Sequence, residues 1–358
     1  MRKQTAVLLA AVLSWTALVY IVAFSALGFS KIRNVPASWP PELASRFEKD
    51  PLARWDSGWY WVVAERGYEW ADDGQAHDTA FFPLYPLLMR WTARATGIPS
   101  VRAGEVLSII FTLAAVLLLA DLARREGFPP GWTVAAILLF PTAFFLVACY
   151  TEGLFLLTTV GALRALRRGR AAEAALWGAA AGFCRPNGIL LVVPVIVESL
   201  ARRRPRLLAA AAGPVAGTAA VGAYFWARFG SPFLYVRSQN AGWHHHFSWP
   251  WRPFIEAWRW LPDRRHDALA AAIVLLLALA LLPRFPAYAA WILASLALIV
   301  ATGSLSSEIR YATVAFPAFF PLAAGLARSR LLAVVYVAAG LAGLVHLTAR
   351  FALGYWVG

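Results

Sequence analysis

The chain has 358 residues, of which 60% are apolar and only 15% are charged. A soluble globular domain carries about 25% charged residues. Apolar runs recur from Thr5 to the C-terminus, and no polar stretch between them is long enough to form an independent soluble domain. The composition therefore excludes an ordinary soluble protein and predicts one membrane-embedded domain over residues 1–358.

Basic residues outnumber acidic ones, 33 against 19, and the formal net charge is +14. Nucleic-acid binding requires a continuous basic surface that follows the phosphates, whereas these residues occupy short gaps between apolar runs. Alternate gaps hold most of them, which is the pattern of cytoplasmic loops. We predict a multi-pass protein of the cell (inner) membrane with a cytoplasmic N-terminus and no nucleic-acid partner. The residues on the predicted cytoplasmic side include Arg2, Lys3, Arg124, Arg125, Arg164, Arg167, Arg168, Arg170, Arg202, Arg203, Arg204, Arg206, Arg284, Arg328 and Arg330.

Eleven apolar segments are candidates for membrane-spanning helices, because about 20 apolar residues cross the bilayer core and fewer suffice among neighbours. The first is longer than the roughly 7 to 15 residues of a signal-peptide core, which favours an uncleaved anchor. The fourth, fifth and sixth are short, and we expect them to end at a polar cavity. The predicted fold class is all-α and polytopic, with about 11 spans. The segments are 5–29, 104–121, 131–149, 152–166, 171–184, 188–201, 207–228, 267–282, 286–303, 311–327 and 331–350.

Two long segments, 30–103 and 230–266, fall on the side opposite the N-terminus and are predicted to be extracytoplasmic loops. Both are rich in Trp, Tyr and charged residues. Aromatic rings with a polar edge favour the headgroup level of a membrane, so we expect short amphipathic helices in the first loop. We place the working face of the protein there.

Asp56 is the most informative acidic residue, within residues 54–60 of sequence Arg-Trp-Asp-Ser-Gly-Trp-Tyr. Aromatic neighbours desolvate a carboxylate in part and make it a better base, which suits general-base work. Aromatic faces also form platforms for sugar rings. A structural role fits equally well: Asp56 would cap a helix that begins at Ser57, and the aromatic residues would form an interfacial belt.

Ionisable residues recur at three later turns on the same predicted side: Glu152, Arg185, and Glu308 with Arg310. Charges at membrane depth are costly and indicate function. A structural ion pair between Arg185 and Glu152 is the alternative. Two arginines at the outer leaflet are suited to hold a lipid phosphate, because guanidinium groups bind phosphate oxygens bidentately.

His244, His245 and His246 are consecutive, so their side chains diverge, and no second Cys or His cluster completes a ligand set. We therefore predict no metal site, and favour a loop that touches phosphate or sugar. Cys149 and Cys184 are expected to be small buried hydrophobes without a disulfide. The chain lacks a P-loop, a dinucleotide fingerprint and a Gly-x-Ser-x-Gly elbow, so no soluble cofactor is predicted.

Several motifs in chain order resemble the PIG-V-like (GPI mannosyltransferase 2-type) mannosyltransferase family, including its bacterial relatives, within the GT-C class of multispan glycosyltransferases. Together they cover most of the chain. Two departures, Thr151 and Gly153, stand where the family has Tyr-Ser-Glu-Ser-Leu-Phe. The motifs are Arg54-Trp55-Asp56 with Tyr60, residues 64–68 (Ala-Glu-Arg-Gly-Tyr), 80–86 (Ala-Phe-Phe-Pro-Leu-Tyr-Pro), 150–155 (Tyr-Thr-Glu-Gly-Leu-Phe), 185–188 (Arg-Pro-Asn-Gly), and Arg310-Tyr311 before Phe316-Pro317.

The resemblance implies a GT-C fold and an inverting enzyme that transfers mannose from a polyprenyl-phosphate-mannose donor to an acceptor hydroxyl on a glycan or glycolipid, outside the cytoplasm. Asp56 would then be the catalytic base, and the outer turns would have to converge on it. Arg185 and Arg310 would hold the phosphate charge, and the histidine loop is a less secure candidate. The residues assigned to donor phosphate or sugar binding are Arg54, Trp55, Tyr60, Glu65, Glu152, Arg185, Asn187, His244, His245 and Arg310.

Two other functions use the same features. A transporter or flippase of lipid-linked saccharides would also have polar groups within spans and an aromatic vestibule, and an inverted repeat of hydropathy would favour it; none is visible by eye. A noncatalytic subunit that stabilises another transferase would tolerate substitution of Asp56.

Overall fold

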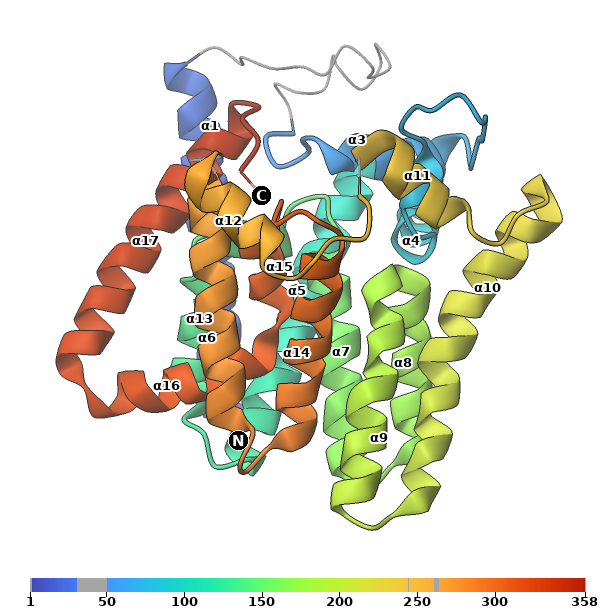
Figure 1. The fold of residues 1–358 in the computed structure, drawn as a ribbon. Coiled ribbons are helices and arrows are strands. Elements are labelled where there is room, and N and C mark those ends of the chain that lie inside the picture. Colours follow the sequence, from blue (N-terminus) through green and yellow to red (C-terminus); the bar gives the residue numbers. More distant parts are fainter. Residues whose placement is uncertain (1, 31–49, 244, 261–263, 358) are drawn as a thin grey trace. The chain divides into compact units, whose positions relative to one another are not determined.

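The computed structural model describes residues 2–30, 50–243, 245–260 and 264–357 (Figure 1). These described residues form α-helices, short 3-10 helices and connecting turns, without a strand. The predicted all-α fold class is therefore confirmed. The chain clusters into two compact units, unit 1 (residues 1–67, 85–157 and 322–358) and unit 2 (68–84 and 158–321). A single membrane domain stays a prediction.

Unit 1 is built around three long apolar helices. Helix α1 (Arg2–Phe29) packs against α5 (Ser100–Arg125) and against α17 (Arg330–Ala352). Two short helices of this unit lie within the predicted first loop, α3 (Asp56–Glu65) and α4 (Leu84–Thr96). The unit is completed by α6 (Pro130–Leu138), η2 (Ala143–Leu146), the first turns of α7 (Glu152–Arg167) and the end of α16 (Phe319–Arg328).

Unit 2 contains the shorter helices of the middle of the chain. Its tightest helix pair is α8 (Ala171–Cys184) with α10 (Ala212–Phe229), which run side by side in Figure 1. The other elements are η1 (Asp78–Ala80), η3 (Pro186–Leu191), α9 (Val192–Ala201), η4 (Pro205–Ala211), α11 (Leu234–Trp243), α12 (Arg252–Arg259), α13 (Arg265–Leu281), α14 (Pro286–Ala301), α15 (Glu308–Val314) and η6 (Phe316–Ala318).

Each of the eleven predicted apolar segments overlaps one or more helices. Among the described residues, four helices are long and apolar enough to cross a membrane, and a bent pair at residues 308–328 brings the number to five at most. Helix α8 has 14 residues, a length of about 21 Å against a bilayer core of about 30 Å. The protein therefore has several helices that are long and apolar enough to span a membrane, and the number 11 stays a prediction.

Two of the predicted segments are interrupted. The segment expected at 131–149 leaves the helix after Leu138 and continues as η2, because Pro141 lacks an N–H and disfavours helix in the residue before it. The segment expected at 311–327 is bent by 77° between α15 and the helix that follows. Pro317 lies just after this break. Proline thus ends or redirects both helices.

Candidate functional site

Asp56 is the first residue of α3 and is half-buried. Residues 54–57 form a turn closed by the Ser57 N–H, which donates to the Arg54 carbonyl over 3.1 Å. Trp55 holds the first central position with φ 51° and ψ −111°, a conformation that glycine normally supplies. Helix α3 therefore begins at Asp56, with Trp55 at the N-cap, one residue earlier than the sequence predicted. The capping role of Asp56 stays a prediction. Asp56 thus begins α3 directly after a turn whose residue Trp55 has a strained backbone conformation.

Arg54 and Trp55 are anchored to the chain that follows α17. The Arg54 side chain is fully buried and donates from Nε to the Ala352 carbonyl (3.0 Å) and from Nη1 to the carbonyls of Asp50 (2.8 Å) and Ala53 (3.1 Å). Burial lowers the pKa of this guanidinium to about 9, against the opposing effect of Glu105 and Asp50. The Trp55 indole donates to the Tyr355 carbonyl over 3.2 Å. These contacts fix the backbone that carries Asp56.

A group of buried hydroxyls lies under α3. The Tyr60 hydroxyl and Thr151 Oγ1 are 3.2 Å apart, and the Tyr60 ring meets the rings of Tyr85 (5.4 Å) and Tyr150 (6.1 Å) edge to face. Ser57 Oγ donates to the Cys149 carbonyl over 3.0 Å. Turn 149–151 therefore supports the first turns of α3.

The two acidic candidates of unit 1 have different environments. Glu152 begins α7 directly after this turn and is 1% exposed. Glu65 ends α3 and is exposed, about 13 Å along the helix from Asp56 at 1.5 Å per residue. Glu65 therefore lies at the opposite end of α3 from Asp56.

In unit 2, two arginines from distant parts of the sequence converge on one aromatic ring. The guanidinium carbon of Arg185 lies 5.0 Å from the centre of the Tyr311 ring, and that of Arg310 lies 5.1 Å from it. Both side chains are buried, at 9% and 5% exposure. They are no more than about 10 Å apart, near the screening length of about 8 Å at physiological salt. Two guanidinium groups at this separation are suited to bind one anion, because both can donate to its oxygens.

The backbone turns that carry these arginines are tightly fixed. Arg185 is extended, as expected before a proline, and its carbonyl accepts from Gly188 N over 2.9 Å. A Cβ at Gly188 would collide with the Ala181 carbonyl. Arg310 follows Ser307, which has a left-handed φ of 69°. Asp267 Oδ1 accepts from Ile309 N over 3.0 Å in the same turn.

The remaining candidates of unit 2 are Asn187, His244 and His245. Asn187 is half-buried in the turn after Arg185. His245 is half-buried, and its N–H donates to the Gln239 carbonyl over 3.1 Å. His244 lies outside the described residues. Within the described part of the chain, no three His, Cys, Asp or Glu side chains gather in a way that would hold a metal ion.

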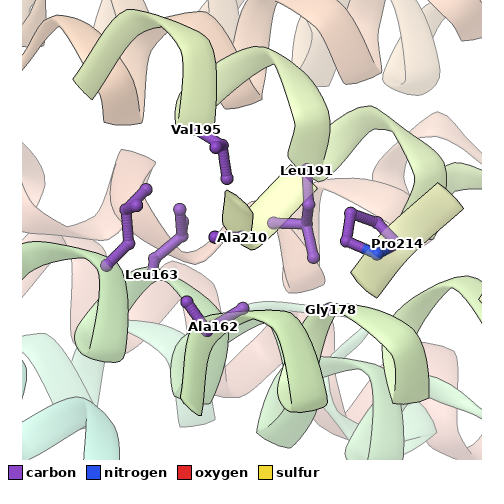
Figure 2. A pocket seen from close by; sticks show the side chains of 9 residues that line it. Ala162, Leu163, Gly178, Leu191, Val195, Ala210 and Pro214 are labelled. Atoms are coloured by element: carbon purple, nitrogen blue, oxygen red, sulfur yellow. The ribbon is translucent and has the colours of Figure 1, made fainter. Parts of the chain in front are cut away.

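A small cavity of about 10 Å³ lies in unit 2 between α7, α8, α9 and α10 (Figure 2). Its lining is wholly apolar, and a water needs two to four polar partners. This cavity is not the polar cavity expected at the ends of the short helices, which stays a prediction. The lining residues are Ala162, Leu163, Leu166, Ala174, Gly178, Leu191, Val195, Ala210 and Pro214.

The candidates thus fall into two groups. Arg54, Trp55, Asp56 and Tyr60 come together in unit 1, and Arg185 and Arg310 come together in unit 2. Sequence reasoning missed the anchoring of residues 54 and 55 by the chain at 352–355, for which the sequence carries no signal. It also gave no role to Tyr311, although this tyrosine was visible in the motif beside Arg310.

Comparison with solved structures places the fold. The crystal structure of ArnT from Cupriavidus metallidurans bound to undecaprenyl phosphate matches with a TM-score of 0.55 at 14% identity, over 89% of this chain and 60% of that chain. At this identity the likeness concerns the fold alone, which is the GT-C fold of membrane glycosyltransferases.

Comparison of sequences places the family. A family model described as mannosyltransferase (PIG-V) matches residues 6–204. GPI alpha-1,6-mannosyltransferase 2 of Mus musculus is 32% identical over 177 residues, which are 44% of this chain and 35% of the mouse protein. The protein of the same description from Homo sapiens is 31% identical over 176 residues, 46% of this chain and 34% of the human protein. The chain belongs to the PIG-V mannosyltransferase family. It spans about a third of the length of these curated relatives.

Proposed function

We propose that the protein transfers mannose from a polyprenyl-phosphate-mannose donor to a hydroxyl of a glycan or glycolipid acceptor at the extracytoplasmic face of the cell membrane, with inversion. The observation that carries the donor proposal is the convergence of Arg185 and Arg310 on Tyr311. Guanidinium groups bind phosphate oxygens in a bidentate manner. The family relationship supports mannose as the sugar, and the structural neighbour carries undecaprenyl phosphate, a lipid of the proposed kind.

The proposed reaction is a single displacement. The acceptor oxygen bonds to the anomeric carbon while the bond from that carbon to the donor phosphate oxygen breaks, which inverts the configuration. The Asp56 carboxylate takes the acceptor proton. The lipid phosphate leaves with one more negative charge than it had in the donor. Because phosphate is already a weak base, no carboxylic acid has to protonate it.

The arginines supply the electrostatic part of the reaction. Fixed cations stabilise a transition state most where negative charge increases during the step. Arg185 and Arg310 are held by rigid turns, so they need little reorganisation as charge builds up on the phosphate. Trp55, Tyr60 and Asn187 are proposed to contact the sugar or phosphate, and Arg54 contributes by fixing the turn before Asp56.

The test is transfer by the purified protein from radiolabelled polyprenyl-phosphate mannose to a panel of glycan and glycolipid acceptors. Asp56→Asn keeps the shape of the side chain and removes the base, so kcat is expected to fall about 10²- to 10⁴-fold. Asp73→Asn, at an exposed carboxylate in the same long segment, is the matched control and should retain transfer. In the same assay, Arg310→Lys should raise KM for the donor, while Arg170→Lys should not.

Each outcome has a definite reading. Equal transfer by Asp56→Asn would reject Asp56 as the base. Wild-type protein that transfers no sugar from any lipid-phosphate donor would reject the donor class and favour a transporter of lipid-linked saccharides.

A further inference from the structure

The turn before Asp56 has a positive φ at Trp55, where a glycine would be free of strain. Trp55 is one of three non-glycine residues with positive φ in the described part of the chain, with Arg203 and Ser307. Its ψ of −111° lies outside the left-handed helical region that Asn and Asp tolerate. Such a conformation persists only where surrounding contacts hold the backbone in place. Residues with strained backbone conformations are found most often at functional sites.

One hydroxyl group holds the turn on both sides of the strained residue. The Tyr150 hydroxyl donates to the Arg54 carbonyl over 3.0 Å and accepts from the Asp56 N–H over 3.2 Å. The two bonds therefore bracket Trp55. The second bond goes to the backbone of Asp56 itself, so it sets the direction in which helix α3 begins.

Tyr150 is itself rigidly placed. The residue is fully buried, and its ring packs edge to face on Phe145 (4.8 Å) and Phe351 (5.8 Å). Its carbonyl accepts from Ser108 Oγ over 3.1 Å, and Ser108 Oγ also lies 2.8 Å from the Tyr85 hydroxyl. The hydroxyl that brackets Trp55 is thus fixed at the ring and at the backbone.

We propose that Tyr150 is a positioning residue for sugar transfer: its hydroxyl locks the turn at Trp55 and so holds the Asp56 carboxylate in its working direction. Tyr150 takes no proton and touches no substrate in this scheme. The inference rests on the proposed function, in which Asp56 is the base. A base displaced by about 1 Å loses up to about 10²-fold in rate.

The test compares Tyr150→Phe with Tyr336→Phe. Both tyrosines belong to unit 1, and Tyr336 donates to the Ala136 carbonyl over 2.6 Å, so each variant loses one tyrosine hydroxyl that binds backbone. For Tyr150→Phe we expect kcat to fall about 10- to 100-fold with donor KM within twofold. Amide hydrogen exchange should become faster in residues 54–60. Tyr336→Phe should change neither. Adding Tyr150→Phe to Asp56→Asn should cause no further loss, because the residue to be positioned is gone.

Failure of the inference is distinguishable from failure of the proposed function. If wild-type protein transfers mannose and Tyr150→Phe has the kcat of Tyr336→Phe, the positioning role is wrong. A fully multiplicative loss in the double variant would also overturn it, since a general structural defect acts whether or not Asp56 is present. If wild-type protein transfers no mannose, the proposed function fails and this inference fails with it.

Discussion

Asp78 is a buried carboxylic acid in unit 2, at 3% exposure. Both of its carboxylate oxygens accept from the Glu69 N–H, over 3.2 and 3.1 Å. Burial raises the pKa of Asp78 to about 7, although this hydrogen bond and His77 act in the opposite direction. The unfolded chain has an ordinary aspartate pKa of about 3.9. Asp78 therefore stays protonated to a higher pH in the folded protein than in the unfolded chain.

This preference predicts a pH-dependent loss of stability. Between pH 4 and pH 7 the unfolded chain binds fewer protons at Asp78 than the folded chain, so the free energy of unfolding falls as pH rises. Asp78→Asn is neutral at every pH and keeps an acceptor for Glu69. It should unfold at the same temperature as wild type at pH 4 and at a higher temperature at pH 8.5, measured by thermal unfolding in detergent. Each pKa unit corresponds to about 1.4 kcal/mol. A variant less stable than wild type at pH 8.5 would contradict the assignment.

The sequence predicts the role of a residue when that role depends on neighbouring residues, and not when it depends on contacts with distant parts of the chain. Asp56 was selected because aromatic neighbours partly desolvate a carboxylate and make it a better base, and its catalytic role stays a prediction. The burial of Arg54 could not be predicted, since one of its acceptors is the carbonyl of Ala352, 298 positions away. Backbone carbonyls carry no sequence signal. The strain at Trp55, of order 1–3 kcal/mol, was likewise invisible, because tryptophan gives no hint of a positive φ.

At the level of elements, the close approach of α8 and α10 depends on small residues in both helices. Gly178 and Gly182 stand four positions apart on α8, and Gly213 and Gly217 do so on α10. A Cβ added at Gly213 or Gly217 would collide with backbone of α8, at Ala175 or Ala179. Spacing of this kind lets membrane helices approach until their backbones touch.

Gly217→Ala should therefore destabilise unit 2. Added volume in a packed contact costs about 1–3 kcal/mol, which thermal unfolding in detergent would detect as a lower Tm. Gly222→Ala is the matched control on the same helix, because its Cβ would meet only Pro232, at 3.4 Å or more. Equal unfolding temperatures for the two variants would show that the α8–α10 contact does not depend on Gly217.

Elements were more predictable than sites because hydropathy is a local property. Each of the eleven apolar segments overlaps helical residues, since a run of apolar residues has to satisfy its own backbone in a membrane. The interruptions at Pro141 and near Pro317 have a clear cause in proline, yet their geometry depends on neighbours. The 77° bend that follows α15 is an example.

For the whole molecule, the distribution of basic residues predicts which loops face outward. Asp73 and Arg170 are exposed, at 47% and 54%, and the predicted topology puts them on opposite sides of the membrane. A membrane-impermeant maleimide should label Asp73→Cys in intact cells and Arg170→Cys only after permeabilisation. Native labelling should be low because Cys149 and Cys184 are both buried. The reverse pattern would overturn the proposed extracytoplasmic active site.

The anchoring of Arg54 by Ala352 also sets an order of events during synthesis. A ribosome adds about 5–20 residues per second, so roughly 15–60 seconds separate the two partners as the chain emerges. Throughout that interval the turn that carries Asp56 lacks the contacts from Ala352 and Tyr355, although Tyr150 is already present. We therefore expect the turn that carries Asp56 to reach its final stability only after α17 has been synthesised.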